Sequence, residues 1–385
     1  MDPLAHTLFG AVLAETGLKR RTALATATLV IGANLPDVDA LAMFHGSDTA
    51  LHLRRGWTHG VLALVLFPFL LTGGMILADR LHTRWRARNA IQRSDIHPIR
   101  RTLSIEPKWL LILSFLSVWS HPLLDWLNTY GIRLFMPFDE TWYYGDTLFI
   151  IDPWFWLLTG AMVVFARSTT WLGISGWLLL GSALSVLVFS TSMVPLMAKI
   201  LWGTGILIIA LIRYFWYGKL ATRPMTNSLV IATLLYVAIM LVGSRLTVRH
   251  AKMHLANQGI EIHEAMSRPL PARPLLRNGI AVSETHYYRF RLNWLIPDSF
   301  ELRGDPVSKT EPNPLVDIAL NTPELKGFRN WIRYPVYEVK KVKSGWRVYI
   351  HDLRYSAPNQ NSPSGIGMAI VDLDQNRQVR TVQVF

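Results

Sequence analysis

Three polar side chains recur at helical spacing beside an apolar stretch. In "SHPLLDWLNT", residues 120–129, Asp125 lies four residues after His121 and Asn128 lies three residues further on. This spacing places all three on one face of a helix. An imidazole and a carboxylate one turn apart can ligate a divalent metal, whereas the alternative is a structural hydrogen bond between them. The stretch before them, "WLLILSFLSVW", raises the question of which solvent that face meets.

Two carboxylates flank one residue in "NLPDVD". Pro36 breaks the helical pattern, and Asp37 and Asp39 follow it. One interpretation is a proline-broken turn capped by acids, because Asp side chains readily accept bonds from nearby amides. A cap needs only one of the two carboxylates, so the other is a candidate metal ligand or base.

Further candidates are found in two other segments. "RRGWTHG" contains Arg55 and His59, and the N-terminal segment contains His6. His59 can alternatively extend to the membrane interface, and Arg55 is either an interface anchor or a clamp for an anionic phosphate. Asp2-Pro3 and Asp152-Pro153 each combine an N-cap acid with a first-turn proline, which favours helix capping.

The composition indicates a membrane protein. Of 385 residues, 51% are hydrophobic and only 17% are charged, against about 25% charged in soluble domains. Apolar runs near the roughly 20 residues that cross a bilayer lie at about 60–79, 109–127, 150–166, 171–189, 196–213 and 227–243. A short apolar helix at about 4–17 and a segment 22–44 that breaks at "NLPDVD" precede these six spans. We therefore expect seven or eight membrane-inserted helices.

The N-terminus does not have the pattern of a cleavable signal peptide. It opens with Asp2-Pro3, and its first basic residues, Lys19, Arg20 and Arg21, follow the apolar stretch instead of preceding it.

The distribution of basic residues predicts the topology. The net charge is +13, but residues 80–108 alone contain eight Lys or Arg against two acids, so the charge favours membrane orientation over nucleic-acid binding. The positive-inside rule places this loop in the cytoplasm. Following the spans onward places Arg167 and Arg213 inside and the 142 residues after position 243 outside.

The C-terminal segment has a different pattern. It is polar from about residue 250 and rich in proline up to 275, and it then reads as short β-like stretches such as "HYYRFRLNWLI" and "GWRVYIHDLRY". We predict a β-rich domain outside the cytoplasm.

This topology brings sequence-distant polar residues to one depth of the outer leaflet. Ionisable groups there are costly unless they pair, bind a metal or line water. The chain has no cysteine, so a metal site must use histidine and carboxylate, most plausibly for zinc, as one ion or two. Such a site favours hydrolysis by a metal-activated water. The residues are His6, Asp37, Asp39, His59, His121 and Asp125.

Four motifs, in order, resemble one family. "DPLAHTLFGAVLAE", "ANLPDVDAL", "RRGWTHG" and "SHPLLDWLNTYG" look like the YdjM/YbcI family of bacterial inner-membrane proteins classed as metal-dependent hydrolases. The match covers about residues 1–165. It implies a membrane-embedded hydrolase with ligands His6, Asp37, His59, His121 and Asp125, and with Asp39 and Arg55 nearby. The arrangement is similar in kind to helical zinc phospholipases C and nucleases, which cleave phosphoesters.

The sequence thus predicts an all-α polytopic membrane bundle with a C-terminal extracytoplasmic β-rich domain. We divide it into a hydrolase-like region (1–165), additional transmembrane helices (166–245) and the β-rich domain (250–385). The predicted function is metal-dependent hydrolysis of a lipid or lipid-linked phosphoester in the bacterial inner membrane, with Asp39 activating water and Arg55 holding phosphate. A non-catalytic scaffold with a structural metal is the alternative. A transporter, the less favoured alternative, would need polar mid-span residues and repeat symmetry, and we find neither in the sequence. Membership of Asn128 and Asp152 in the site stays open.

Overall fold

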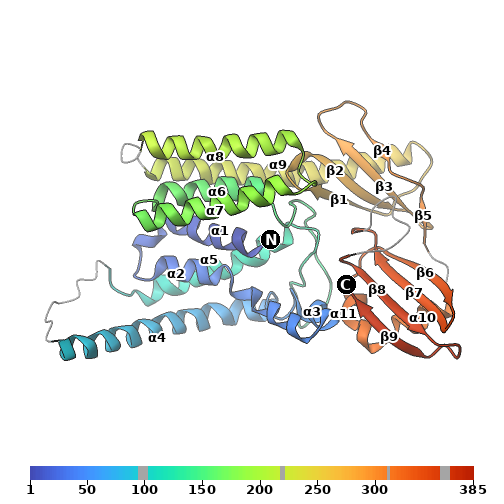
Figure 1. Ribbon diagram of the computed structural model, residues 1–385, viewed down its shortest axis with the longest axis horizontal. Helices are drawn as coiled ribbons and strands as arrows, with labels where there is room; N and C mark the ends of the chain where they lie inside the picture. The colour runs from blue at the N-terminus through green and yellow to red at the C-terminus, as the bar shows by residue number, and fades with distance from the viewer. Residues whose placement is uncertain (94–102, 217–221, 310–312, 356–364) are drawn as a thin grey trace. The chain divides into compact units, whose positions relative to one another are not determined.

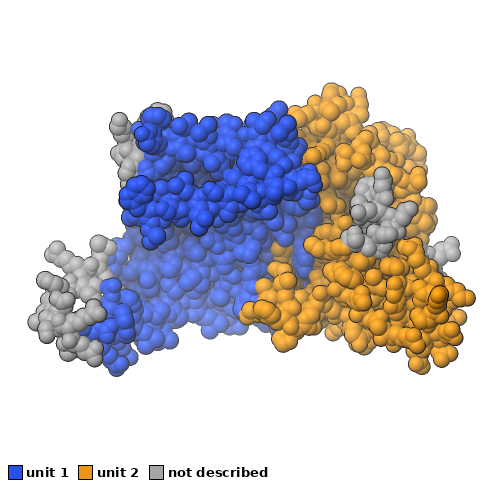
Figure 2. Space-filling model, in the orientation of Figure 1, with its two compact units in different colours: residues 1–38, 57–144, 149–239 blue, residues 39–56, 145–148, 240–385 orange. Residues whose placement is uncertain are grey.

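The structure is a computed structural model that describes residues 1–93, 103–216, 222–309, 313–355 and 365–385. The chain forms two compact units (Figure 2). Unit 1 comprises residues 1–38, 57–144 and 149–239, and unit 2 comprises residues 39–56, 145–148 and 240–385. Unit 2 therefore contains two short segments from the N-terminal half of the chain.

Unit 1 is built from helices that run side by side (Figure 1). They are α1 (Pro3–Glu15), η1 (Leu18–Arg20), α2 (Ala25–Gly32), α4 (Val61–Arg93), α5 (Pro107–Trp126), α6 (Pro153–Arg167), α7 (Trp171–Ser190) and α8 (Leu196–Trp216). The 3-10 segment η2 (Leu35–His45) and helix α9 (Thr222–Ala256) each continue from unit 1 into unit 2. Each of the six apolar runs identified in the sequence coincides with one helix.

Four helices in the described part of the chain are long and apolar enough to cross a membrane: α4, α7, α8 and α9. Helix α2 and segment η2 form a fifth candidate if the pair, bent by 41°, is one broken span. The break between them lies at Ala33 and Asn34, two residues before Pro36, in the segment where the sequence predicted it. Helix α5 contains His121 and Asp125, and α6 has only 15 residues, so the number of candidates is smaller than the six spans expected.

Both predicted N-caps are confirmed. The Asp2 carboxylate accepts bonds from the Leu4 and Ala5 amides at 3.0 and 3.1 Å. Asp152 accepts bonds from the amides of Trp154 and Phe155, both at 3.0 Å, and from the Tyr236 hydroxyl at 2.8 Å. These carboxylates satisfy amides that a helix start leaves without intrahelical partners.

Two glycines allow the N-terminal helices to pack closely. A Cβ on Gly10 of α1 would lie 2.6 Å from the Leu29 carbonyl oxygen of α2. A Cβ on Gly32 of α2 would lie 2.0 Å from Ser117 Oγ of α5. Both distances are too short for any side chain, so these contacts fix the spacing of α1, α2 and α5.

Unit 2 contains two antiparallel sheets, which confirms the predicted β-rich C-terminal region. One sheet consists of β1 (Glu264–Leu270), β2 (Arg273–Val282), β3 (His286–Asn293), β4 (Glu301–Leu302) and β5 (Val307–Ser308). The other has the order β6 (Pro335–Val342), β7 (Gly345–Asp352), β8 (Met368–Leu373) and β9 (Val379–Val384). Short helices accompany them: α3 (Ser47–Leu53), α10 (Pro314–Leu320), η3 (Pro323–Leu325) and α11 (Lys326–Trp331).

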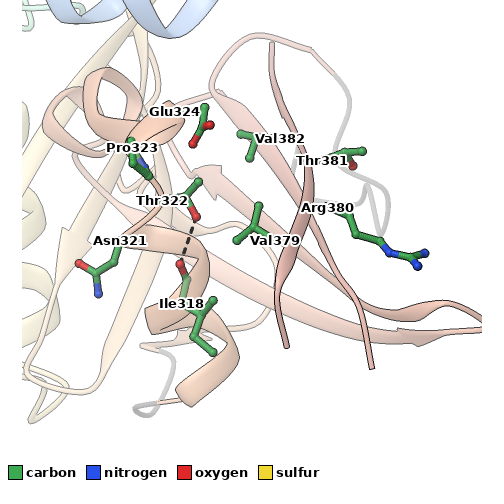
Figure 3. A pocket seen from close by; sticks show the side chains of 9 residues that line it. All are labelled: Ile318, Asn321, Thr322, Pro323, Glu324, Val379, Arg380, Thr381 and Val382. Atoms are coloured by element: carbon green, nitrogen blue, oxygen red, sulfur yellow. Dashed lines mark hydrogen bonds between the residues drawn. The ribbon is translucent and has the colours of Figure 1, made fainter. Parts of the chain in front are cut away.

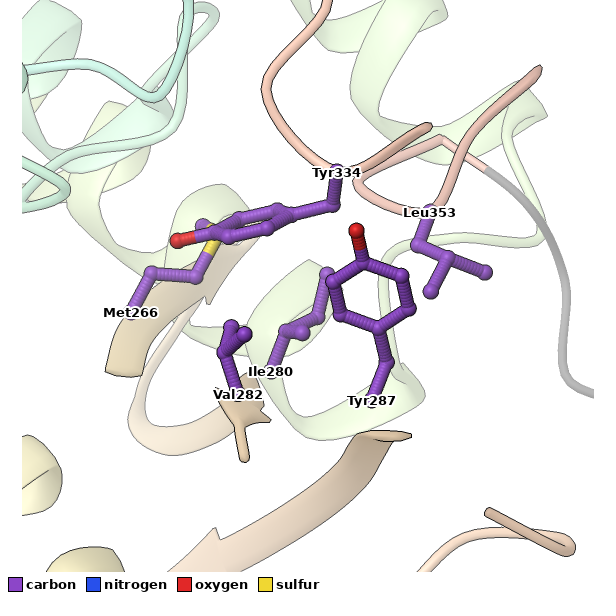
Figure 4. Close-up of a cluster of buried hydrophobic side chains, with 6 residues drawn as sticks. All are labelled: Met266, Ile280, Val282, Tyr287, Tyr334 and Leu353. Carbon is purple, nitrogen blue, oxygen red and sulfur yellow. The ribbon is translucent and has the colours of Figure 1, made fainter. Parts of the chain in front are cut away.

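One apolar cluster joins the first sheet to residues flanking the second (Figure 4). Met266, Ile280 and Val282 project from β1 and β2 toward Tyr334 and Leu353, with Tyr287 of β3 beside them. Tyr334 directly precedes β6 and Leu353 directly follows β7. Ala281 of β2 and Phe290 of β3 instead pack with Ala251 and Leu255 of α9, so residues on both faces of the first sheet are buried.

A pocket of about 480 Å³ opens in unit 2 between Asn321–Glu324 and strand β9 (Figure 3). The Thr322 hydroxyl donates to the Ile318 carbonyl of α10 at 3.1 Å. This bond holds the segment that forms one wall.

Candidate metal centre

Four chain segments bring the predicted ligands together in unit 1. His6 lies on α1, Asp37 on η2, His59 in the turn before α4, and His121 and Asp125 one turn apart on α5. The side chains of the three histidines and Asp125 are fully buried, and that of Asp37 is 17% exposed. Burial of so many ionisable groups needs a compensating partner for each charge.

Asp37, His59, His121 and Asp125 offer one ligand atom each within 4.8 Å of one another. His121 Nε2 lies 3.1 Å from His59 Nε2, 3.6 Å from Asp125 Oδ2 and 3.7 Å from Asp37 Oδ1. His59 Nε2 lies 3.3 Å from Asp125 Oδ2. The helical spacing of His121 and Asp125 therefore directs both side chains to one point, as the sequence predicted.

The tautomer of His121 follows from a backbone contact. Its Nδ1 lies 2.6 Å from the carbonyl oxygen of Ala33 at the end of α2. A carbonyl only accepts hydrogen bonds, so Nδ1 carries the proton and donates it. In the neutral ring, Nε2 then presents a lone pair toward His59 and the two carboxylates. His59 Nδ1 similarly contacts Thr58 Oγ1 at 2.9 Å.

These contacts pass the test for a metal. Carboxylate oxygens and an imidazole lone pair are all acceptors, so the group needs hydrogen-bond donors or a cation among them. The Met1 amino group contacts Asp125, and an N–H of His59 or a metal ion can serve the remaining acceptors. Two imidazoles and two carboxylates are a common ligand set for zinc, and a carbonyl behind the outer ring nitrogen is the usual support of a histidine ligand.

His6 lies against the group of four without being one of its members. Its ring stacks on His121 with 3.8 Å between centroids, and its Nε2 lies 3.2 Å from Asp125 Oδ1. The same Asp125 oxygen also contacts the amino group of Met1. His6 thus reaches the predicted location, and its role as a ligand stays a prediction.

The two predicted catalytic residues, Asp39 and Arg55, belong to unit 2. Asp39 Oδ2 accepts a bond from the Arg55 backbone amide at 2.8 Å. Arg55 is 2% exposed and adopts a left-handed backbone with φ of 52°. This contact holds Asp39 and Arg55 together. The role of Asp39 as general base and that of Arg55 as phosphate clamp stay predictions.

The two residues whose membership was open have local partners. Asn128 Oδ1 accepts a bond from the Tyr130 amide at 2.8 Å, which forms a turn after α5. Asp152 is the N-cap of α6 described above, and neither residue belongs to the group of four.

The sequence did not predict the Ala33 and Thr58 contacts that support His121 and His59. A backbone carbonyl leaves no sequence pattern, although the threonine directly before His59 was visible.

Comparison with known families agrees with the four motifs. The YdjM inner membrane protein family model matches residues 1–199, which is more than half of the chain. The chain belongs to the YdjM inner membrane protein family. The match extends past the 165 residues of the resemblance and includes α7. No curated protein and no solved structure was found to match the chain.

Proposed function

We propose that this YdjM family member is a metal-dependent hydrolase of the bacterial inner membrane, acting on a lipid or lipid-linked phosphoester. The observation that carries the proposal is the convergence of acceptor atoms from Asp37, His59, His121 and Asp125 within 4.8 Å. A divalent cation bound there, most plausibly zinc, would lower the pKa of a coordinated water to about 7 and so supply a nucleophile at neutral pH.

The residues of the chain divide the remaining work. Asp37, His59, His121 and Asp125 would hold the metal, with His6 as a further ligand or as support for Asp125. The Ala33 carbonyl orients His121. In the proposal, Asp39 accepts the proton of the attacking water and Arg55 binds the phosphate of the substrate through its guanidinium.

The lipid substrate is inferred from the setting of the centre. Its ligands come from helices of an inner-membrane family protein, and a substrate that diffuses within a leaflet can reach such a site laterally. From the basic residues at 80–108 we infer, by the positive-inside rule, that the site and the C-terminal region lie on the outer side. Reporter fusions after residue 260 should report the outer compartment, and a cytoplasmic report would refute this orientation.

The test compares two neighbouring acids. Asp37→Asn should lose metal, measured by elemental analysis of the purified protein, and activity with it. Asp39→Asn should keep metal and lower turnover about 10² to 10⁴-fold on a panel of phospholipids and lipid-linked phosphates.

Exchanged results would exchange the roles of the two acids. If the wild-type protein holds stoichiometric metal and hydrolyses none of the panel, the catalytic proposal is wrong and the metal has a structural role.

A further inference from the structure

Unit 1 contains a cavity of about 530 Å³ between α6, α7 and α8 that is separate from the metal centre. Its size falls within the roughly 300–1,000 Å³ typical of ligand sites. Its lining on α7 runs from Ile174 to Ser185, about three turns of the helix. The cavity therefore extends along the helices, and its walls are mainly apolar.

Two glycines keep the cavity open. A Cβ added to Gly160 of α6 or to Gly181 of α7 would meet no described atom within 4 Å, and both residues line the cavity. Gly10 and Gly32 behave differently, because their helices touch directly at those positions. Gly160 and Gly181 therefore provide space instead of close packing.

The two ends of the cavity differ in charge. At one end, Trp202 Nε1 of α8 donates to Ser185 Oγ of α7 at 3.0 Å. At the other end, Arg213 of α8 contacts the hydroxyl and carbonyl of Ser168, where α6 ends. An apolar channel with a guanidinium at one end matches a ligand with a long apolar tail and an anionic group.

We propose that this cavity binds one anionic phospholipid, with an acyl chain between α6, α7 and α8 and its phosphate at Arg213. Helices α7 and α8 are membrane-span candidates, so a cavity between them would lie at the depth of the bilayer hydrocarbon, where lipid is the abundant amphiphile. Arginines near helix ends meet the headgroup region. Free phosphate would match only Arg213 and leave the apolar walls without a partner.

This lipid is distinct from the proposed substrate. Leu8 of α1 lines the cavity, whereas His6, two residues earlier, contacts Asp125 in the metal centre. Residues two apart on a helix point in widely different directions. The cavity and the metal centre thus lie on different faces of α1.

The test uses the two open glycines. Full-length protein in mild detergent, mixed with phosphatidylglycerol, is examined by native mass spectrometry. Wild type should retain one lipid per chain, and Gly160→Leu or Gly181→Leu should lower its affinity at least about tenfold. The matched control is Gly176→Leu, because Gly176 is exposed on the same α7 helix, has no described atom within 4 Å of an added Cβ and does not line the cavity.

A second arm separates headgroup from tail. Arg213→Gln keeps a side chain able to bond to Ser168 and removes the charge, so it should abolish the preference for phosphatidylglycerol over phosphatidylcholine. Unchanged far-UV circular dichroism and thermal unfolding in all these variants verify that unit 1 is folded. Equal lipid retention by the Gly160, Gly181 and Gly176 variants, or retention of detergent alone by the wild type, would overturn the proposal.

Discussion

The two units each bury a cluster of carboxylates, but they neutralise it with different cations. In unit 1, Asp37 and Asp125 face imidazole nitrogens, whose charge depends on a proton, and Asp125 also contacts the amino group of Met1. In unit 2, Asp352 contacts Arg354 at 2.8 Å with both side chains fully buried, and Asp146 contacts Arg333 at 2.9 Å. A guanidinium is always charged, so each of these unit 2 pairs carries its own cation.

The difference distinguishes a structural ion pair from a binding site. Asp352 also accepts bonds from the amides of Arg333 and Arg354, at 2.8 and 2.9 Å, so its oxygens are used within the fold. Burial alone would lower the pKa of Arg333, but the Asp146 carboxylate raises it above its usual value. The unit 1 cluster differs from both pairs, because two carboxylates and two imidazoles offer ligand atoms within 4.8 Å of one another, a geometry that can hold a metal ion.

The largest effect is expected from removing a convergent ligand. His59→Ala, His121→Ala and Asp125→Ala should each reduce bound metal from stoichiometric to near zero, because a compact site loses its geometry with one ligand. Elemental analysis of the purified protein measures this loss. His82→Ala, on α4 away from the group, is the control that should keep its metal. Full metal in all three variants would show that the metal binds elsewhere in the protein.

Breaking the buried pair of unit 2 should have the opposite signature. Asp352→Ala leaves the Arg354 guanidinium without its carboxylate and should cost about 3 to 5 kcal/mol of stability. Faster hydrogen exchange in β6 and β7, with metal content unchanged, is the expected measurement. Loss of metal without any change in exchange would contradict the division of roles between the clusters.

A smaller effect is expected at a close approach within unit 2. A Cβ on Gly327 of α11 would lie 2.1 Å from the Asp48 carbonyl oxygen of α3. Gly327→Ala should therefore separate α3 from α11 at a cost of about 1 to 3 kcal/mol. Thermal unfolding followed by tryptophan fluorescence measures this cost. Gly259 is not a suitable control position, because its positive φ of 78° would strain an alanine there. Gly74→Ala, with open space around it, is the suitable control.

The smallest effect concerns a partly exposed pair. Burial would raise the pKa of Glu264, but bonds from the Tyr334 hydroxyl at 2.7 Å and Arg333 at 2.9 Å place it below its usual value. A lowered pKa means that the carboxylate stabilises unit 2 at neutral pH and that this contribution is lost as pH falls below about 4. Glu264→Gln should lower stability by at most about 1 kcal/mol at pH 7 and should flatten the acid limb of the unfolding curve. An unchanged acid limb would assign that limb to other carboxylates.

Local patterns in the sequence predicted much of unit 1. Apolar length located the helices, Asp-Pro pairs located two caps, and the i, i+4 spacing correctly paired His121 with Asp125. The Ala33 support was not predictable, because it depends on how α2 packs against α5 and not on a side-chain type. In unit 2, β-like stretches were expected only after the proline-rich segment that ends at 275, whereas Pro269 and Pro274 lie in strands β1 and β2. Pairing with the partner strand outweighs local preference there, with a register shift at Pro269.

The division of unit 2 into distant segments has a consequence for biosynthesis. The Phe328 amide donates to Asp48 Oδ1 across 280 positions of sequence. At about 5 to 20 residues per second, a ribosome needs roughly 15 to 55 seconds to synthesise that interval. During this time residues 39–56 have been translated but lack their C-terminal partner. A chain that ends prematurely anywhere before residue 328 therefore leaves this segment unpaired, and we expect quality-control proteases to degrade such truncated products faster than the complete protein.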